Sequence, residues 1–230
     1  MTHEIIPILC NEKKMANYAY LITTPKTSQT IIIDAAEANP IIQELEKRHL
    51  HPSHILTTHH HFDHVEGNLA IKEKYNCEII VPKKEFNQIP GASIAVQDGD
   101  ILNIRDIKLQ ILETPGHTLG HILYYLPDEQ RLFTGDTLFN LCVGGLFEGT
   151  PEQMFNSLQK IKSLPNNTEI FPGHEYTRSC LPEGFTNIPQ TKNYIRKMLE
   201  REQGHLAPST LEEEKAFNPY LKADKLTEFM

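Results

Sequence analysis

No stretch of this 230-residue sequence is apolar enough to cross a membrane. A membrane-spanning helix needs about 18 consecutive, mostly apolar residues, whereas the long apolar runs here are stretches such as residues 31–33 and 79–81. The N-terminus also lacks the basic segment and the extended apolar segment of a signal peptide. We therefore expect a cytoplasmic protein that makes no membrane contact.

Positive charge and paired cysteines are also scarce. The chain has 22 Lys and Arg residues against 30 Asp and Glu, a net charge of −8, and no Lys or Arg cluster. This balance repels the phosphate backbone of nucleic acids, so nucleic-acid binding is disfavoured. The four cysteines, Cys10, Cys77, Cys142 and Cys180, form no C-x-x-C motif, which favours reduced, buried thiols over a disulfide framework.

The apolar pattern predicts a mixed α/β domain followed by a small helical segment, as the length also allows. Short apolar runs bounded by Pro, Gly and Asp indicate strands at residues 5–9, 18–23, 30–33, 55–58, 78–81, 107–112, 122–126 and 131–134. Helices are expected from Asn39, as the N-cap, to Leu50, over residues 65–75, and after Thr150, where Gln153 completes a capping box. Beyond residue 173 no strand is expected, and helices are predicted over residues 190–203 and from Ser209, with Glu212 completing a capping box.

Histidine is the residue type that stands out. Twelve are present, and four of them lie in the segment Thr58-His59-His60-His61-Phe62-Asp63-His64, directly after a predicted strand. Because side chains alternate in an extended segment, His59 and His61 should project to one side and His60 to the other. Asp63 and His64 follow where the chain turns into the next helix. Imidazole and carboxylate groups are ligands of Zn²⁺ and related divalent metals, so the segment predicts a metal site.

Three later residues stand beside glycine at the end of an apolar run. They are His117 in Thr-Pro-Gly-His-Thr, Asp136 in Phe-Thr-Gly-Asp-Thr and His174 in Phe-Pro-Gly-His-Glu. Each alone would more often be structural than catalytic. Together with the first cluster they make seven candidate ligands, which is enough for two metals.

The H-x-H-x-D-H signature, followed in order by Gly-His, Gly-Asp and Gly-His, resembles the metallo-β-lactamase superfamily. Within it, the stretches THHHFDHVEG, ETPGHTLGHI, LFTGDTLF, FEGTPEQM, FPGHEYT and PSTLEEEKAFNPYL resemble the glyoxalase II family over essentially the whole chain. The resemblance implies an α/β fold, a four-layer αββα sandwich of two sheets between helices. It also implies a catalytic domain at residues 1–173 and a small helical substrate-binding domain at residues 174–230.

The same resemblance implies a dinuclear centre. It assigns His59, His61 and His117 to the first metal and Asp63, His64 and His174 to the second, with Asp136 and a water or hydroxide bridging them. Two zinc ions are expected, and iron or manganese would also suit these ligands. Asp63 and Asp136 are the expected catalytic carboxylates. His60 and His121 are expected to be hydrogen-bonding neighbours of the ligands.

The implied activity is hydrolysis of a glutathione thioester, S-lactoylglutathione to lactate and glutathione, by metal-bound hydroxide in a monomeric enzyme. The leaving thiolate needs no general acid because the pKa of its thiol is about 8.5. Tyr176 matches the family tyrosine that contacts glutathione, and backbone amides at Gly144 and Gly145 are expected to bind part of the carrier. Gly145 and Phe147 stand where the family commonly has a Lys and a Tyr, and the chain reaches Met230 without the family's terminal Arg and Lys. The carrier is therefore expected to bind weakly.

Three alternatives stay open from the sequence. A mononuclear iron persulfide dioxygenase of the same superfamily shares the signature but uses a two-His, one-carboxylate site. The substrate of a hydrolase could also be a thioester of another thiol carrier. A catalytically silent metal-binding module is disfavoured because structural zinc sites are usually closed and rich in cysteine. The residues expected to lie away from the metals are Cys142 and, at the surface or in caps, His3, His49, His51, His54 and His205.

Overall fold

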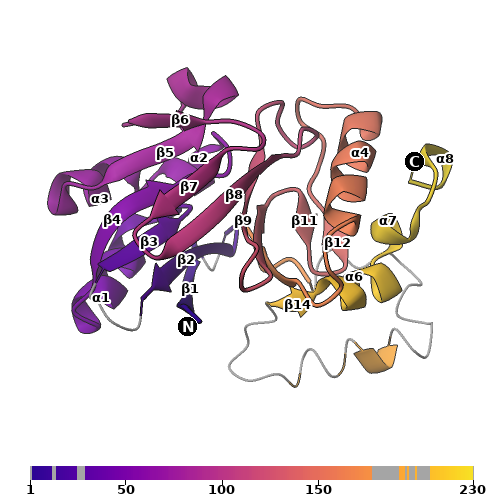
Figure 1. Cartoon of the computed structure of the whole chain (residues 1–230), viewed down its shortest axis with the longest axis horizontal. Coiled ribbons are helices and arrows are strands. Elements are labelled where there is room, and N and C mark those ends of the chain that lie inside the picture. The colour runs from indigo at the N-terminus through magenta and orange to yellow at the C-terminus, as the bar shows by residue number, and fades with distance from the viewer. Residues whose placement is uncertain are drawn as a thin grey trace.

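Two six-stranded sheets form the centre of the protein (Figure 1). The structure is a computed structural model. It describes residues 2–11, 14–24, 29–177, 192–194, 196, 200 and 208–229. The first sheet contains β1 (Glu4–Cys10), β2 (Asn17–Thr23), β3 (Gln29–Ile33), β4 (His51–Leu56), β5 (Glu78–Pro82) and β6 (Ile94–Val96), in that spatial order. The second has the order β14 (Ser209–Thr210), β13 (Glu169–Pro172), β10 (Arg131–Gly135), β9 (Ile122–Leu126), β8 (Ile107–Glu113) and β7 (Ile101–Ile104). A separate hairpin consists of β11 (Leu138–Phe139) and β12 (Cys142–Val143).

Strand direction brings the ends of several strands to one edge of the sandwich. β3, β4, β5 and β6 run parallel to one another, and β10 runs parallel to β13. The chain therefore leaves β4, β10 and β13 at the carboxyl ends of these strands, at one edge of the sandwich. In other sheets with parallel strands, ligand sites also form outside the carboxyl ends. Each of these three exits leads directly into candidate metal ligands.

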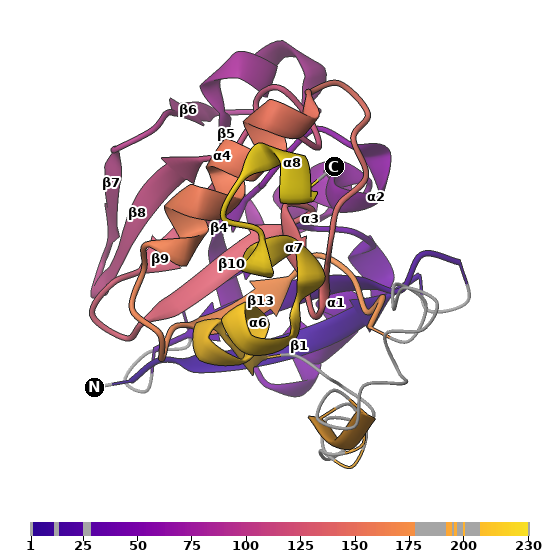
Figure 2. The same cartoon turned by 90° about the vertical axis from the view of Figure 1, so that its right-hand side faces the viewer.

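Helices cover the outer faces of both sheets, so the molecule has four layers (Figures 1 and 2). On the first sheet lie α1 (Ala38–Lys47), α2 (Phe62–Val65), α3 (Asn68–Tyr75) and the 3₁₀ helix η1 (Lys83–Gln88). On the second lie α4 (Pro151–Lys162), α6 (Leu211–Phe217), α7 (Pro219–Lys222) and α8 (Leu226–Phe229). Three buried apolar clusters separate the layers, one between the two sheets and one under each helical layer. This confirms the expected sandwich with a small helical C-terminal part.

Several local expectations need correction. The first helix begins after Glu37 and not after Asn39, so Pro40 lies within its first turn, where a missing N–H costs no hydrogen bond. The helix expected over residues 65–75 begins later, as α3 at Asn68 after Gly67, and Val65 is the last residue of the separate helix α2. A Cβ at Gly67 would lie 2.7 Å from the carbonyl oxygen of Ala35, and this close approach requires glycine.

The C-terminal segment also differs from expectation. Ser209 and Thr210 form β14, which pairs with β13, although no strand was expected beyond residue 173. A two-residue polar strand has no periodicity that a sequence could reveal. The capping box of α6 is formed by Thr210 and Glu213, one residue later than the expected pair, whereas the box at Thr150 and Gln153 is present as expected. Of the helix expected over residues 190–203, residues 192–194, 196 and 200 are described, and these are helical.

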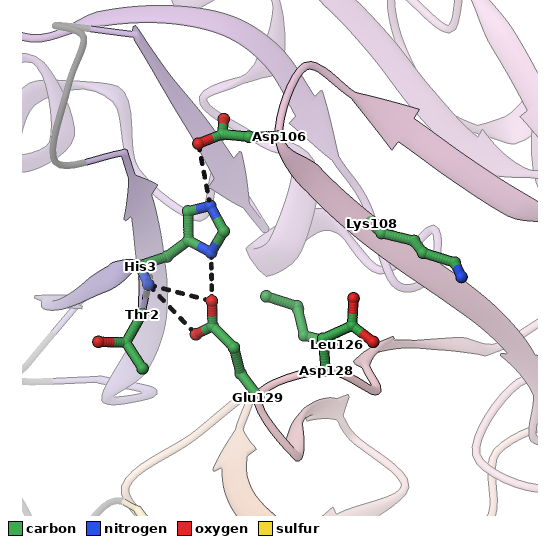
Figure 3. Close-up of a pocket in the computed structure, with 7 residues that line it drawn as sticks. All are labelled: Thr2, His3, Asp106, Lys108, Leu126, Asp128 and Glu129. Carbon is green, nitrogen blue, oxygen red and sulfur yellow. Dashed lines mark hydrogen bonds and ion pairs between the residues drawn. The ribbon is translucent and has the colours of Figure 1, made fainter.

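His3 was expected at the surface or in a cap and is instead buried between two acidic residues (Figure 3). Its Nδ1 contacts Glu129, and its Nε2 lies 3.6 Å from Oδ2 of Asp106, so the ring joins the start of β1 to two turns of the second sheet. Among the other histidines expected away from the metals, His49 and His51 are exposed, His54 is half-buried, and His205 lies outside the described residues. Cys10, Cys77 and Cys142 are buried thiols, as expected, whereas Cys180 also lies outside the described residues.

Among the described residues, no helix combines the length and the hydropathy that a membrane crossing requires. The C-terminal helices instead pack on the second sheet, where Leu211 and Leu221 join the same buried cluster as Leu158 of α4. The division into domains at residues 173 and 174 stays a proposal.

Candidate metal centre

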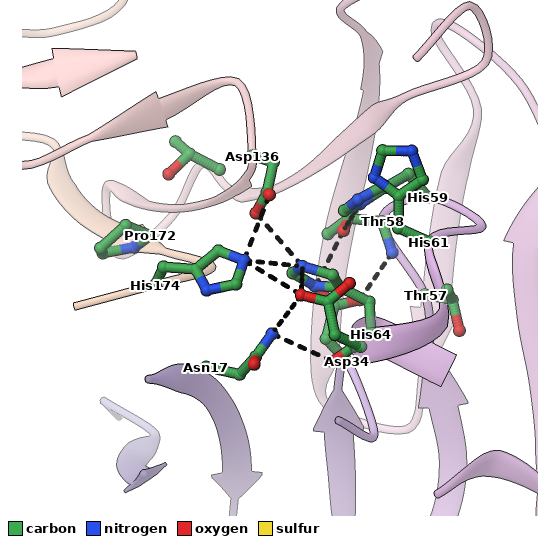
Figure 4. Close-up of polar contacts among 12 residues, drawn as sticks. Asn17, Asp34, Thr57, Thr58, His59, His61, His64, Asp136, Pro172 and His174 are labelled. Atoms are coloured by element: carbon green, nitrogen blue, oxygen red, sulfur yellow. Dashed lines mark hydrogen bonds and ion pairs between the residues drawn. The ribbon is translucent and has the colours of Figure 1, made fainter. Parts of the chain in front are cut away.

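The histidine-rich segment covers the loop from β4 to α2 and the first turn of α2, which carries Asp63 and His64 (Figure 4). His59 is buried, and its ring packs 4.8 Å from that of His61. The ring of His60 points elsewhere and lies between the carboxylates of Glu85 and Glu148, as the alternation of side chains predicts. The segment therefore directs the imidazoles of His59, His61 and His64 to the site and that of His60 away from it.

Three other loops bring the remaining candidates to the same place. His117 follows β8, Asp136 follows β10, and His174 follows β13, and all three side chains are buried. The seven candidates gather as two triplets of mutually close ligand atoms with Asp136 between them. The triplets are His59, His61 and His117, and Asp63, His64 and His174.

Asp136 contacts both triplets. Its Oδ2 lies 3.4 Å from Nε2 of His117 and 3.2 Å from Nε2 of His174, and its Oδ1 lies 3.3 Å from Nε2 of His64. Asp63 closes the second triplet, with its Oδ2 3.4 Å from Nε2 of His174. The structure thus brings together the residues that the sequence grouped, although their role as ligands stays a prediction.

Hydrogen bonds fix the orientation of four of the imidazoles. Nδ1 of His117 donates to the carbonyl oxygen of Gly145 at 2.7 Å, and Nδ1 of His174 donates to that of Met15 at 2.7 Å. Nδ1 of His64 donates to Oδ2 of Asp34 at 3.0 Å. Nδ1 of His59 bonds to the hydroxyl of Thr58 at 3.0 Å. Each ring is thereby held with Nε2 directed into the site, as is usual for histidines that bind metals.

The donor set fits a divalent cation. Because His64 and His174 each donate through Nδ1, their Nε2 atoms carry lone pairs when the rings are neutral, yet these atoms lie only 3.2 Å apart. Two facing lone pairs repel unless a proton or a cation lies between them. Nε2 of His59 is also buried without a hydrogen-bond partner among the described residues. Zinc ligands about 2.0–2.1 Å from one ion at tetrahedral angles lie about 3.3–3.4 Å apart, close to the separations seen here.

Burial keeps the first triplet neutral. It lowers the pKa of His59 and His117, and, together with the neighbouring His117 and His60, it lowers the pKa of His61 to about 4. Neutral imidazole is the form that binds metals, so these three rings are ready to do so at neutral pH.

The second triplet has the opposite electrostatic character. Burial alone would lower the pKa of His64, but the carboxylates of Asp136 and Asp34 outweigh it and raise this pKa well above its usual value. Burial would likewise raise the pKa of Asp136, but His64 and His174 hold it well below its usual range. This part of the site therefore favours a positive charge, which a divalent cation would supply.

Three supporting residues were not found by sequence reasoning. Asp34, besides holding His64, accepts hydrogen bonds from the backbone N–H of Thr58 at 2.7 Å and from its hydroxyl at 2.8 Å. Asn17 donates to Oδ2 of Asp63 at 2.9 Å. Buried Glu85 accepts from the backbone N–H groups of His60, at 2.7 Å, and of Gly120, at 2.9 Å, and so joins the two loops that carry the first triplet.

His121 and Cys142 lie outside the two triplets, as expected. The backbone N–H of Asp136 donates to Nε2 of His121 at 3.0 Å, and Nδ1 of His121 faces the hydroxyls of Thr114 and Thr137 at 3.2 and 3.1 Å. Both ring nitrogens are thus engaged. Among the described residues, no group of candidate ligands includes Cys142.

A pocket of about 520 Å³ opens over the candidate ligands. Its walls include Tyr176, Gly145 and Phe147, three of the four residues expected to contact substrate. The ring of Tyr176 stacks on that of His174 at 4.5 Å, and the ring of Phe147 lies 5.2 Å from that of His117. The fourth residue, Gly144, has its N–H directed to the carbonyl oxygen of Thr137 at 3.4 Å, so this amide is engaged within the hairpin.

Comparison with known proteins agrees with this geometry. A family model described as the metallo-beta-lactamase superfamily matches residues 14–174, and the chain belongs to this superfamily. The fold is similar to that of the BLEG-1 B3 metallo-beta-lactamase, with a TM-score of 0.76, 23% identity, and coverage of 96% of this chain and 100% of the other. It is also similar to that of ETHE1 from Myxococcus xanthus, with a TM-score of 0.76, 25% identity, and coverage of 98% and 88%.

Curated relatives narrow the similarity to one enzyme family. A hydroxyacylglutathione hydrolase of Pelagibacter ubique is 43% identical over 213 residues, which cover 90% of this chain and 89% of the relative. A hydroxyacylglutathione hydrolase of Mesorhizobium japonicum is 40% identical over 227 residues, which cover 96% and 88%. The resemblance inferred from the sequence is confirmed at both levels.

Proposed function

We propose that the protein hydrolyses glutathione thioesters, with S-lactoylglutathione as the substrate, at a centre of two zinc ions. The observation that carries this proposal is the convergence of two ligand triplets on either side of Asp136 beneath an open pocket. The named activity of the curated relatives supports the choice of substrate.

His59, His61 and His117 would hold one ion, Asp63, His64 and His174 the other, and Asp136 both. Bound there, two divalent cations would lower the pKa of a water molecule in the site and polarise the thioester carbonyl. Asn17 and Asp34 hold Asp63 and His64 in place for this task. The leaving thiolate can depart without a proton donor because the pKa of its thiol is about 8.5.

The pocket walls would bind the substrate. Tyr176 stacks on the ring of His174 and lines the pocket, so the thiol carrier would contact it beside the second triplet. Phe147 offers an apolar face beside the first triplet, and the backbone at Gly145 forms the adjoining wall. In this proposal, residues 174–230 form the substrate-side domain, and the enzyme acts as a monomer in the cytoplasm.

The test is a panel of thioesters assayed on zinc-loaded protein, together with metal analysis. S-lactoylglutathione should be hydrolysed with a higher kcat/KM than its coenzyme A or N-acetylcysteamine counterpart, by protein that binds two metals per chain. A higher kcat/KM for another carrier would refute the glutathione assignment and leave the hydrolase. One iron per chain with no thioester hydrolysis would favour the persulfide dioxygenase. Metal binding with no turnover would favour a silent module.

A further inference from the structure

The C-terminal helix α6 carries a buried carboxylate that has no part in the centre described above. Glu214 is fully buried. Its Oε2 accepts hydrogen bonds from the backbone N–H of Leu141 at 2.9 Å and from Nδ2 of Asn218 at 2.9 Å. Burial of a carboxylate is unfavourable without such partners, so the position of Glu214 is coupled to that of Leu141.

Leu141 lies in the turn of the β11–β12 hairpin. Phe139 pairs with Cys142 across this hairpin, which leaves Asn140 and Leu141 as its turn. The φ angle of Leu141 is 64°, in the left-handed region that side chains other than glycine rarely adopt. The hydrogen bond to Glu214 holds the residue in this conformation, and Nδ2 of Asn218 donates to the adjacent carbonyl oxygen of Cys142 at 3.2 Å.

The hairpin leads directly to the metal centre. Phe139 and Val143 line the pocket, and the ring of Phe139 lies 5.7 Å from that of His174. Two residues after Val143, the carbonyl oxygen of Gly145 accepts the Nδ1 hydrogen bond that orients His117. A displacement of the turn would therefore move both a wall of the pocket and the acceptor that aligns a candidate ligand.

We infer that Glu214 is a positioning residue of the metal centre: it fixes the β11–β12 hairpin and, through the carbonyl of Gly145, the orientation of His117. The inference rests on the metal centre of the proposed function but not on its substrate. It assigns to the C-terminal segment a role in metal binding in addition to its packing on the second sheet.

The test compares Glu214→Ala with Glu214→Gln and with Glu212→Ala, a control in the same helix whose carboxylate is exposed. Zinc affinity is measured by competition with a chromophoric chelator, and amide hydrogen exchange is followed over residues 138–145. Glu214→Ala should weaken zinc binding by about 10- to 100-fold, the usual effect of losing a group that orients a ligand. It should also accelerate exchange in the hairpin.

Glu214→Gln should restore most of both properties because its side-chain oxygen can still accept from Leu141, and Glu212→Ala should match the wild type. A merely structural Glu214 would lower the unfolding temperature of the alanine variant but leave zinc affinity and hairpin exchange unchanged below the transition. That result would overturn the inference.

Asn218→Ser provides the same test if Glu214→Ala does not fold. Serine keeps an oxygen for the cap of α7, where Asn218 accepts from the N–H of Tyr220 at 3.0 Å. It loses the Nδ2 group that donates both to Oε2 of Glu214 and to the carbonyl oxygen of Cys142, and so loosens the hold of Glu214 on the hairpin turn. Faster exchange in the hairpin with weaker zinc binding is expected, and wild-type values of both would overturn the inference. Wild-type protein that binds no zinc would refute the metal centre and this inference together. If the variants bind zinc more weakly but the wild type hydrolyses no thioester, only the proposed substrate is refuted.

Discussion

The buried carboxyl group of Glu214 should make the stability of the protein depend on pH near neutrality. Burial raises its pKa to about 7 from an ordinary value of 4.5, although hydrogen bonds from Nδ2 of Asn218 and the N–H of Leu141 oppose the rise and the nearby Glu213 adds to it. Between these two pH values the folded state holds a proton that the unfolded chain has released. The free energy of unfolding should therefore fall as the pH rises through this window.

The magnitude follows from the two pKa values. At 1.36 kcal/mol for each pKa unit, a difference of about 2.5 corresponds to about 3 kcal/mol once the pH exceeds 7. Glu214→Gln keeps the shape of the side chain but removes the titrating group, so the free energy of unfolding of this variant should not fall in this pH window. Relative to the variant, the wild type should therefore become less stable by about 3 kcal/mol between pH 4.5 and pH 8.

Urea denaturation at several pH values measures this difference, with both proteins at the same metal content so that the titration of the metal centre cancels. Glu212→Gln, in which an exposed carboxylate is lost, should follow the wild type at every pH. Parallel stability curves for the wild type and Glu214→Gln would refute the reasoning, because they would mean that Glu214 titrates alike in the folded and unfolded states.

Three further changes test the metal centre and the pocket. Asp136→Ala should abolish thioester hydrolysis and reduce the metal content below that of Asp63→Ala, since it removes a ligand of both ions; loss of one metal with activity kept would contradict the bridging role. Asp34→Asn should weaken zinc binding by about 10- to 100-fold in a chelator competition, because it removes the carboxylate that orients His64; unchanged affinity would show that this bond does not align the ring. Tyr176→Phe should raise KM for S-lactoylglutathione by about 10-fold with little change in kcat. This is the effect expected when the variant loses a hydrogen bond of about 1.5 kcal/mol to a charged carrier. An unchanged KM would show that Tyr176 does not contact the carrier.

The sequence predicts the long, buried strands well but not the short ones at the edges of the sheets. β2, whose residues are all buried, is apolar enough to be recognised. β6 has three residues, two of them exposed, and β14 has two residues. Such segments are strands because a longer neighbour offers hydrogen-bonding groups, and the location of that neighbour is a property of the folded chain.

The candidate ligands could be predicted because their chemistry and their local context coincide. His59 and His61 belong to one short motif, and Asp136 follows glycine at the end of an apolar strand. Asn17 has no such signal, and Asp34 directly follows the apolar strand β3 but has neither an adjoining glycine nor a metal-binding motif. Asp34 lies 30 residues before the imidazole that it orients, and Asn17 lies 46 residues before the carboxylate that it holds.

Two of the groups that orient the imidazoles are not side chains at all. The carbonyl oxygens of Met15 and Gly145 accept the Nδ1 hydrogen bonds of His174 and His117, and any residue type could supply a carbonyl oxygen at these positions. What matters is the backbone path that brings the oxygen to the ring. For Gly145 this path is the β11–β12 hairpin, which Glu214 and Asn218 hold from the C-terminal segment. The seven candidate ligands therefore specify which chemistry is available, whereas the accuracy of the centre depends on distant residues that hold the backbone around it.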